Sequence, residues 1–533
     1  MKTKAILIII GVLTLIPCHA QQMEPGDIPT PNASDLGRYG EIPVSYYTGR
    51  PDISIPIHTM NIRGLEFPIS LQYDASGVLL NSLPGWTGHN WSLLAGGAIT
   101  RIRQGMYDEY EPENQLYGHP FTNYFHCYGK LKEHLDITDS LMNNVYLNRY
   151  DYQADIFTFS FLGKSGRFFL GNDGQWKVLS EDNMDVVFNI NDQSNYISPF
   201  ISHVPYNGLN SEINGKVIKG FTLRDDRGYV YEFGGTNDAI DYEVGFFSQN
   251  EDNPNTFFPT TWYLTKIKDA YGNTLYELKY ERGVFIAQLY NAAYSMSIID
   301  ESDGSNQNEY NINNNSFPYD GILNAPVYLK SIKSADNVYV KFISDYSHKS
   351  TDDMYPNIDV YDKYPDTDHY SNTFFYYLQT DDSEVTPYQY TNNYNMRRMH
   401  PLSATRLKEL SKIVFQYDSA YALTSKTVTF DYDYSSRMHL TDVKTIAITD
   451  QMYDTCYHYH LDYNSYYLLP ADYLSRAYDG WGYYNGASSN NINSSNHNPD
   501  LSKNLYGQLE RITYPTGGHS SFTYELNDYS CAT

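Results

Sequence analysis

The chain has 533 residues, and its 37 lysines and arginines against 63 aspartates and glutamates give a formal net charge of −26. This acidity argues against a nucleic-acid-binding protein, because such proteins need basic surface to displace phosphate counterions. Disorder is also excluded, since 41% of the residues are hydrophobic and 16% are aromatic. The 55 tyrosines and 35 glycines favour pleated strands joined by tight turns, so we predict an all-β fold.

Residues 1–20 have the pattern of a secretory signal peptide. Lys2 and Lys4 precede an apolar run, and Pro17 and a small residue, Ala20, follow it. The run is too short to span a bilayer, and no later stretch approaches that length, so we expect no transmembrane span. We expect cleavage after Ala20 and export to the periplasm, the cell surface or the medium. Lipidation of Cys18 is the weaker alternative, because rigid Pro17 precedes it.

The mature chain divides by composition into four regions. We assign residues 21–38 to an extended arm and residues 39–290 to an N-terminal β region with one helical insertion near 130–148. Residues 291–400 form a loop-rich β region with acidic and Asn-rich insertions, and residues 401–533 form a C-terminal β-hairpin region that ends in a YD-like unit. Within these regions, long loops are expected at 300–317, 351–368 and 486–499.

Strands are indicated by alternation of apolar and polar residues. The period of two is clearest at 157–161, 428–434 and 457–463. Turn signals such as Asp173-Gly174, 226–228 and Gly272-Asn273 stand where hairpin connections would be. We therefore predict an extended antiparallel sheet built from successive hairpins.

The mature chain retains three cysteines, Cys127, Cys456 and Cys531. At most one disulfide can form within the chain, and the sequence does not choose among the pairs. So few cysteines cannot hold a chain of this length, and a hydrophobic core must do so.

Several motifs, in order along the chain, resemble secreted RHS/YD-repeat proteins of Bacteroidetes. The opening at 31–49 and the segment WSLLAGGAITR at 91–101 carry most of the resemblance, together with WGYYNG at 481–486 and RITYPTGG at 511–518. One departure is Asn90, where the family has a glycine in the turn before Trp91; a left-handed Asn90 would preserve that turn. The motif positions with an expected structural role are Trp91, Gly96, Gly97, Arg101, Gly234, Gly235, Trp262, Trp481, Gly482, Pro515, Gly517 and Gly518.

The resemblance implies a structural role. Such proteins are similar to the shell-forming subunits of insecticidal toxin complexes, in which strands wind into a hollow β-shell that encloses cargo. This chain resembles the N-terminal part of that family, as a fragment of a longer protein or as a short form. We therefore expect an exported, non-enzymatic protein that encloses or scaffolds cargo, or that is displayed at the cell surface.

One group of side chains in the sequence could form a metal site, and known catalytic motifs are absent from it. No nucleophile elbow, HExxH, Walker or GxGxxG motif occurs, and the glycines at 480–486 are interpreted as a tight turn with buried rings. Alternation places Cys456, His458, His460 and Asp462 on one face of a strand, where two imidazoles could share a zinc ion. Four-ligand spacing is missing, however, so we expect a polar strand face with no metal, no other cofactor and no catalytic residue.

Two alternatives remain. Tyrosine-rich faces would suit a carbohydrate-binding or adhesive module, with a glycan as partner, although core filling explains tyrosines equally well. Adjacent acids such as Asp225/Asp226, Asp352/Asp353 and Asp381/Asp382 would be needed for a glycoside hydrolase, but neighbours in a strand face opposite ways.

A final expectation concerns partners. The strands expected at 511–514 and 521–524 form a last hairpin with an uncovered edge. We therefore expect self-association or a partner chain that continues the sheet.

Overall fold

The structure is a computed structural model. It describes residues 42, 44–45, 49–109, 123–128, 151–199, 203–206, 209–212, 216–245, 257–284, 286–291, 296–298, 310–312, 319–350, 354–355, 406–417, 423–449, 452–487 and 498–526. The expected signal peptide, the expected arm and the expected helical insertion near 130–148 lie outside these residues.

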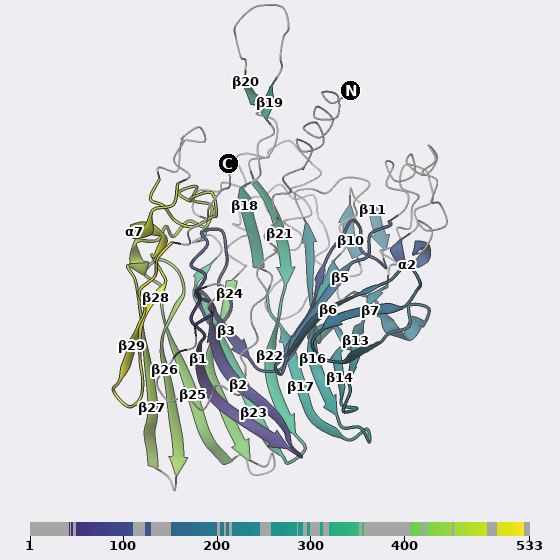
Figure 1. The fold of residues 1–533 in the computed structure, drawn as a ribbon, viewed down its shortest axis with the longest axis horizontal. Coiled ribbons are helices and arrows are strands. Elements are labelled where there is room, and N and C mark those ends of the chain that lie inside the picture. Colours follow the sequence, from purple (N-terminus) through teal and green to yellow (C-terminus); the bar gives the residue numbers. More distant parts are fainter. Residues whose placement is uncertain are drawn as a thin grey trace, which may run out of the picture.

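Antiparallel strands dominate the described residues, which confirms the predicted all-β class (Figure 1). Helices are few and short there, and include α2 (Tyr124–Cys127) and α7 (Leu501–Asn504). In this part of the chain no helix combines the length and apolar character needed to cross a membrane.

The first half of the main sheet surrounds an aromatic core. Its strand order returns to its start, because β16 pairs with β4 as well as with β14. Rings of Phe157, Phe168, Phe221 and Trp262 meet there with centroids 4.9–5.8 Å apart. We call this part the ring. Its strands are β4 (Gly97–Ile102), β5 (Ile156–Phe161), β6 (Lys164–Leu170), β7 (Trp176–Ser180), β8 (Met184–Val187), β13 (Gly220–Asp225), β14 (Val230–Gly234) and β16 (Phe258–Lys268).

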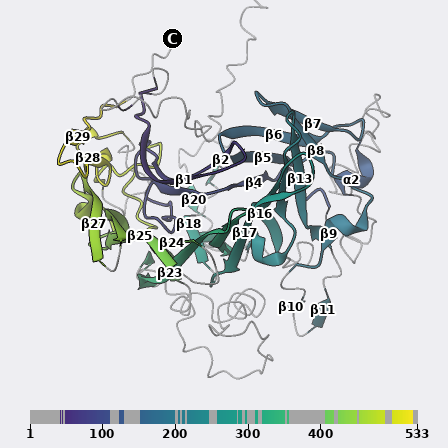
Figure 2. The ribbon, with the colours of Figure 1, turned by 90° about the horizontal axis from the view of Figure 1, so that it is seen from below.

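The second half of the main sheet, which we call the wall, continues from β16 through β17 as a run of antiparallel strands. These long strands follow an arc in Figure 2. The wall strands are β17 (Thr274–Arg282), β22 (Val327–Ser334), β23 (Val338–Ser350), β24 (Arg406–Tyr417), β25 (Leu423–Asp433), β26 (His439–Thr449), β27 (Met452–Tyr463), β28 (Leu509–Thr513) and β29 (His519–Ser521).

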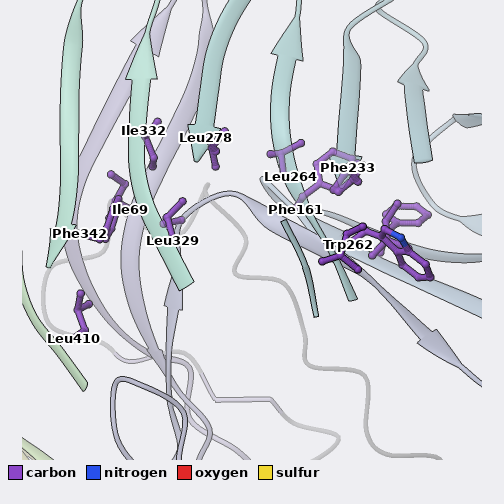
Figure 3. Packing of buried hydrophobic residues seen from close by; sticks show 14 of the residues in the cluster. Ile69, Phe161, Phe233, Trp262, Leu264, Leu278, Leu329, Ile332, Phe342 and Leu410 are labelled. Atoms are coloured by element: carbon purple, nitrogen blue, oxygen red, sulfur yellow. The ribbon is translucent and has the colours of Figure 1, made fainter. Parts of the chain in front are cut away.

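A separate three-stranded sheet lines the inner side of the arc, as Figure 2 shows. It consists of β1 (Ile53–Ile62), β2 (Leu65–Tyr73) and β3 (Trp91–Leu94). Its contacts extend along the wall: the Tyr276 hydroxyl on β17 donates to the Leu65 carbonyl, and the Tyr73 hydroxyl accepts from the amide of Leu509 on β28. In Figure 3, Ile69 of β2 lies in the same apolar cluster as Ile332 and Phe342 of the wall. The sheet and the wall therefore share one core.

Smaller pairings complete the fold. The first half of β16 also pairs with β15, which is followed by β21 and β18. The remaining strands are β15 (Ile240–Gly245), β18 (Ile286–Asn291) and β21 (Tyr319–Ala325), with the pairs β9 (Tyr196–Ile197) and β12 (Val217–Ile218), β10 (His203–Tyr206) and β11 (Leu209–Glu212), and β19 (Met296–Ile298) and β20 (Tyr310–Ile312).

Most local predictions hold. Turns at Asp173-Gly174, 226–228 and Gly272-Asn273 join β6 to β7, β13 to β14 and β16 to β17. The expectation of a continuous loop at 300–317 is wrong in one place, because β20 pairs with β19 there.

The last hairpin also differs from the prediction. Its second strand spans 519–521 instead of 521–524. The reason is a tight turn, in which the amide of Tyr514 donates to the Gly518 carbonyl and pairing resumes directly at His519.

Candidate functional site

The predicted polar face of β27 is present at His458 and His460, and β27 is not an edge strand of the wall. His458 and His460 are exposed, with side chains 47% and 46% accessible, while Leu461 is buried on the opposite face. Both histidines pair with β26, through Lys444 and Asp442, and His460 also pairs with Thr513 of β28. The backbone that carries the two imidazoles is therefore held by sheet pairing.

A third group comes from β26. Asp442 lies directly opposite His460, and its Oδ1 is 2.6 Å from His458 Nε2 and 2.9 Å from His460 Nδ1. Asp462 approaches from the other side, with Oδ1 3.3 Å from His460 Nε2. Asp442, His458 and His460 each offer a ligand atom, and these atoms lie within 4.8 Å of one another. We call these three residues the His–Asp triad.

Cys456 does not continue this face by simple alternation. Thr445 is opposite Tyr457 and Ile446 is opposite Thr455, so Cys456 is the extra residue of a β-bulge. The side chains of Cys456 and Cys531 lie outside the described part of the chain. The third cysteine, Cys127, is buried in α2, and its thiol donates to the Asp151 carbonyl at 2.5 Å.

The electrostatics around Asp442 favour its charged form. Burial raises the pKa of this carboxyl, but the hydrogen bonds from His458 and His460 outweigh burial and hold the pKa below its ordinary value. A second pair lies beside it, in which Lys444 Nζ is 2.5 Å from Asp431 Oδ2. Asp431 is opposite Asp442 on β25, so a row of acidic and imidazole groups crosses three strands.

Sequence reasoning missed Asp442. Asp442 lies on β26 and His458 on β27, and only the register of these two strands brings the side chains together. A signal did exist, because a hairpin turning near residue 450 would place the two segments opposite each other. The bulge at Cys456 shifts that register by one residue, which the sequence does not reveal.

Trp91, Trp262 and Asn90 have structural roles. Trp91 is buried, and its indole N–H donates to the Tyr463 hydroxyl at 2.8 Å. Trp262 is buried within the ring and donates to the Ile218 carbonyl at 2.9 Å. Asn90 has a φ of +62°, which confirms that the turn before Trp91 survives without glycine.

The motif glycines allow close backbone approach. A Cβ on Gly97 would lie 2.2 Å from the Ser160 carbonyl oxygen, and one on Gly234 would lie 2.5 Å from the Lys219 carbonyl oxygen. Gly96 and Gly235 have positive φ values of 109° and 93°. These positions therefore specify the chain path at the ring.

Arg101 is the charged motif residue inside the ring. Its Nη2 donates to both carboxylate oxygens of Glu109 at 2.9 Å, and its Nε lies 3.5 Å from Asp155 Oδ2. The guanidinium also sits 5.1 Å from the Trp262 ring centroid. Burial raises the pKa of Asp155 to about 7, although Arg101 opposes that rise. The nearby Asp108 carboxyl has its pKa raised, first by burial and then by Asp155.

The turn motifs at the C-terminal side are only partly as expected. Gly482 has a φ of +94° in a tight turn. The expectation of buried rings is wrong for Trp481, which is 55% exposed, because the turn projects it from the surface. Pro515, Gly517 and Gly518 form the turn of the last hairpin, and Gly517 has a φ of +84°.

Asp225 has a structural use that explains its burial. Its Oδ1 accepts from the amides of Arg227 and Tyr229, and its Oδ2 accepts from the Tyr231 hydroxyl. This carboxylate therefore caps a hairpin turn. The pairs Asp352/Asp353 and Asp381/Asp382 lie outside the described residues, and glycoside hydrolysis stays a prediction.

Some tyrosines are buried in the core and others are exposed to solvent. Tyr231, Tyr242 and Tyr276 are fully buried, whereas Tyr271 and Tyr467 are 92% and 60% exposed. Core filling accounts for the first group, and glycan binding stays a prediction for the second.

No protein-family model matches the chain, and neither does any curated protein. Among solved structures, it is similar to TcdB2-TccC3-TEV, with 12% sequence identity and a TM-score of 0.33 over 83% of this chain. This chain spans only 17% of that one. It is also similar to the N-terminal domain of the effector protein SpvB from Salmonella typhimurium strain LT2, with 11% identity and a TM-score of 0.27 over 74% of this chain and 99% of that one.

Proposed function

We propose that this chain is an exported, non-enzymatic structural protein that forms part of a β-shell and encloses or scaffolds cargo, or is displayed at the cell surface. The observation that carries the proposal is the wall, a run of antiparallel strands from β17 to β29 that curves around the sheet β1–β3 (Figure 2). The resemblance of its motifs to secreted RHS/YD-repeat proteins supports the same role. The motif residues Trp91, Gly97, Arg101 and Trp262 hold the chain path and the core, as a structural role requires.

The wall has an edge at β29. Among the described strands, β29 pairs residue by residue with β28. The amide of Tyr514 donates to Gly518 O and the amide of Phe522 donates to Glu510 O, so these are the hydrogen-bonded pairs of the hairpin. In an antiparallel pair the intervening residues direct their backbone groups away from the partner. His519 and Ser521 therefore present N–H and C=O groups at the outer edge.

An exposed edge of this kind pairs with another strand. We propose that β29 is the position at which the shell continues, through a second copy or through a partner chain. The acidic charge opposes association of two copies, but salt screens surface charges beyond about 8 Å at physiological ionic strength.

Sedimentation velocity of residues 21–533 over a wide concentration range tests this proposal. The test variant is Ser521→Pro, which removes an outward N–H and keeps the hydrogen bonds of the hairpin. Ser521→Ala is the matched control, because it changes the side chain and keeps the N–H. We expect wild type and Ser521→Ala to associate with rising concentration and Ser521→Pro to remain monomeric at an unchanged melting temperature. Wild type that stays monomeric, or Ser521→Pro that associates equally, would contradict self-pairing at this edge.

A further inference from the structure

We propose that the His–Asp triad on the outer face of β26 and β27 is a Zn²⁺ site, with Asp442, His458 and His460 as ligands. The proposal is independent of the shell function. It replaces our expectation of no metal, because β26 supplies Asp442 as a third ligand, whereas the sequence offered only Cys456 or Asp462 for that place.

The arrangement of donor atoms supports a single ion. His458 Nε2 and His460 Nδ1 both point at the same oxygen, Asp442 Oδ1, at 2.6 and 2.9 Å. A cation placed among the three atoms replaces two N–H···O contacts with two nitrogen ligands and one carboxylate ligand. Zinc sites commonly use three protein ligands of these types and leave a fourth position for water or another ligand.

The identity of the ligands selects the metal class. Imidazole nitrogen suits zinc and other late transition metals, whereas Mg²⁺ and Ca²⁺ prefer oxygen ligands and larger ligand numbers. We therefore expect Zn²⁺ to bind and Mg²⁺ and Ca²⁺ to fail at equal concentration.

A second carboxylate orients one of the ligands. Asp462 Oδ1 lies 3.3 Å from His460 Nε2, the ring nitrogen that does not face Asp442. Metal-binding histidines usually donate their other N–H to such a carboxylate, which fixes the tautomer and the ring orientation. His460 thus has the outer partner that a zinc ligand needs.

The surroundings also favour a cation. Asp431, Asp442 and Asp462 carry three negative charges, and Lys444 and Arg511, which is opposite Asp462 on β28, carry two positive charges. The sum for these five groups is −3 + 2 = −1. Lys444 is opposite His458, but its ammonium lies 2.5 Å from Asp431 Oδ2 and is held there. Attraction to a divalent ion therefore remains at the triad.

The sheet holds the ligands in place. Asp442 and His460 are directly opposite each other, and His460 is also opposite Thr513 on β28. The imidazoles remain half exposed, so the open coordination position faces solvent. An exposed, incomplete site of this kind can accept a further ligand atom from another molecule.

The test uses the chain of residues 21–533 purified without a polyhistidine tag and stripped with a chelator. Zinc affinity is measured by competition with a chromophoric chelator, and stoichiometry is measured by elemental analysis after gel filtration. The test variants are His458→Ala, His460→Ala and Asp442→Asn. The matched control is His519→Ala, because His519 is an exposed histidine on the same sheet, on β29, and does not belong to the triad.

We expect one zinc ion per chain for wild type and for His519→Ala. Each triad variant should lose affinity by more than tenfold, since even outer-shell changes cost about 10–100-fold at metal sites. Zinc should raise the melting temperature of wild type and leave that of the triad variants unchanged. Wild type that binds less than one ion, or triad variants that bind as tightly as His519→Ala, would overturn the proposal. Melting curves without metal separate loss of the site from loss of the fold.

Discussion

Replacing Arg101 with methionine should destabilise the protein strongly at neutral pH. The side chains of Arg101, Glu109 and Asp155 are only 1%, 2% and 0% exposed, so the change leaves buried carboxylates without their cation. Breaking a buried pair in this way costs about 3–5 kcal/mol. Backbone amides still donate to both acids, from Gln104 to Asp155 at 2.8 Å and from Ile218 to Glu109 at 3.3 Å. We therefore expect the lower end of that range, about 3 kcal/mol.

The matched control is Arg63→Met. Arg63 makes an ion pair of the same 2.9 Å length with Asp269, but its side chain is 62% exposed. Surface ion pairs contribute below about 1 kcal/mol to stability. The difference in stability loss between Arg101→Met and Arg63→Met therefore measures the effect of burial. Urea unfolding followed by intrinsic fluorescence measures both, and thermal melting checks that the transitions agree.

The pH dependence of the Arg101→Met loss gives a second readout. The pKa of Asp155 is already about 7 in the presence of Arg101, and it rises further when that cation is removed. At pH 5 this carboxyl is protonated and no longer requires a cation. The free energy of unfolding lost in Arg101→Met should therefore be smaller at pH 5 than at pH 7.5. A loss below about 1 kcal/mol at pH 7.5, or a large loss that is equal at both pH values, would refute the reasoning.

Three further predictions concern single positions. Gly97→Ala should lower the free energy of unfolding by about 3 kcal/mol or more, because the new Cβ would lie 2.2 Å from a backbone oxygen. Gly163→Ala is the control in the same denaturation assay, and it should cost only about 1–2 kcal/mol, because Gly163 has a φ of +76° but no atom within 4 Å of the new Cβ. Trp91→Phe should cost about 1–3 kcal/mol, since the Tyr463 hydroxyl loses its donor, and a melting temperature equal to wild type would count against this bond. Burial lowers the pKa of His439 to about 4, so the unfolded chain takes up the proton first as pH falls. The stability from His439 is therefore present above about pH 6.5 and is lost toward pH 4. His439→Gln should flatten that part of the stability curve, and an unchanged slope would show that this histidine does not set it.

The sequence by itself determined several of the strands and their local turns. Alternation at 157–161 and 457–463 fixed the strand period, because side chains in a strand alternate between faces. A left-handed Asn90 is expected through the resemblance, in which a glycine stands at this place in the turn, and asparagine tolerates that region better than most residues. These features depend on a few consecutive residues, which is the range over which sequence pattern carries information.

Only the tertiary structure decided which strands meet. Nothing local shows that β16 pairs with four other strands, or that β1–β3 lines the wall instead of extending it. The same holds for the candidate sites, because Asp442 reaches His458 through the register of two long strands and one bulge, and Arg101 meets Asp155 through the pairing of β4 with β5. Long-range register is set by the burial of whole faces, and a shift of one residue would turn every side chain to the other side of the sheet. That cooperative choice is made by the packed core and is not encoded in any short segment.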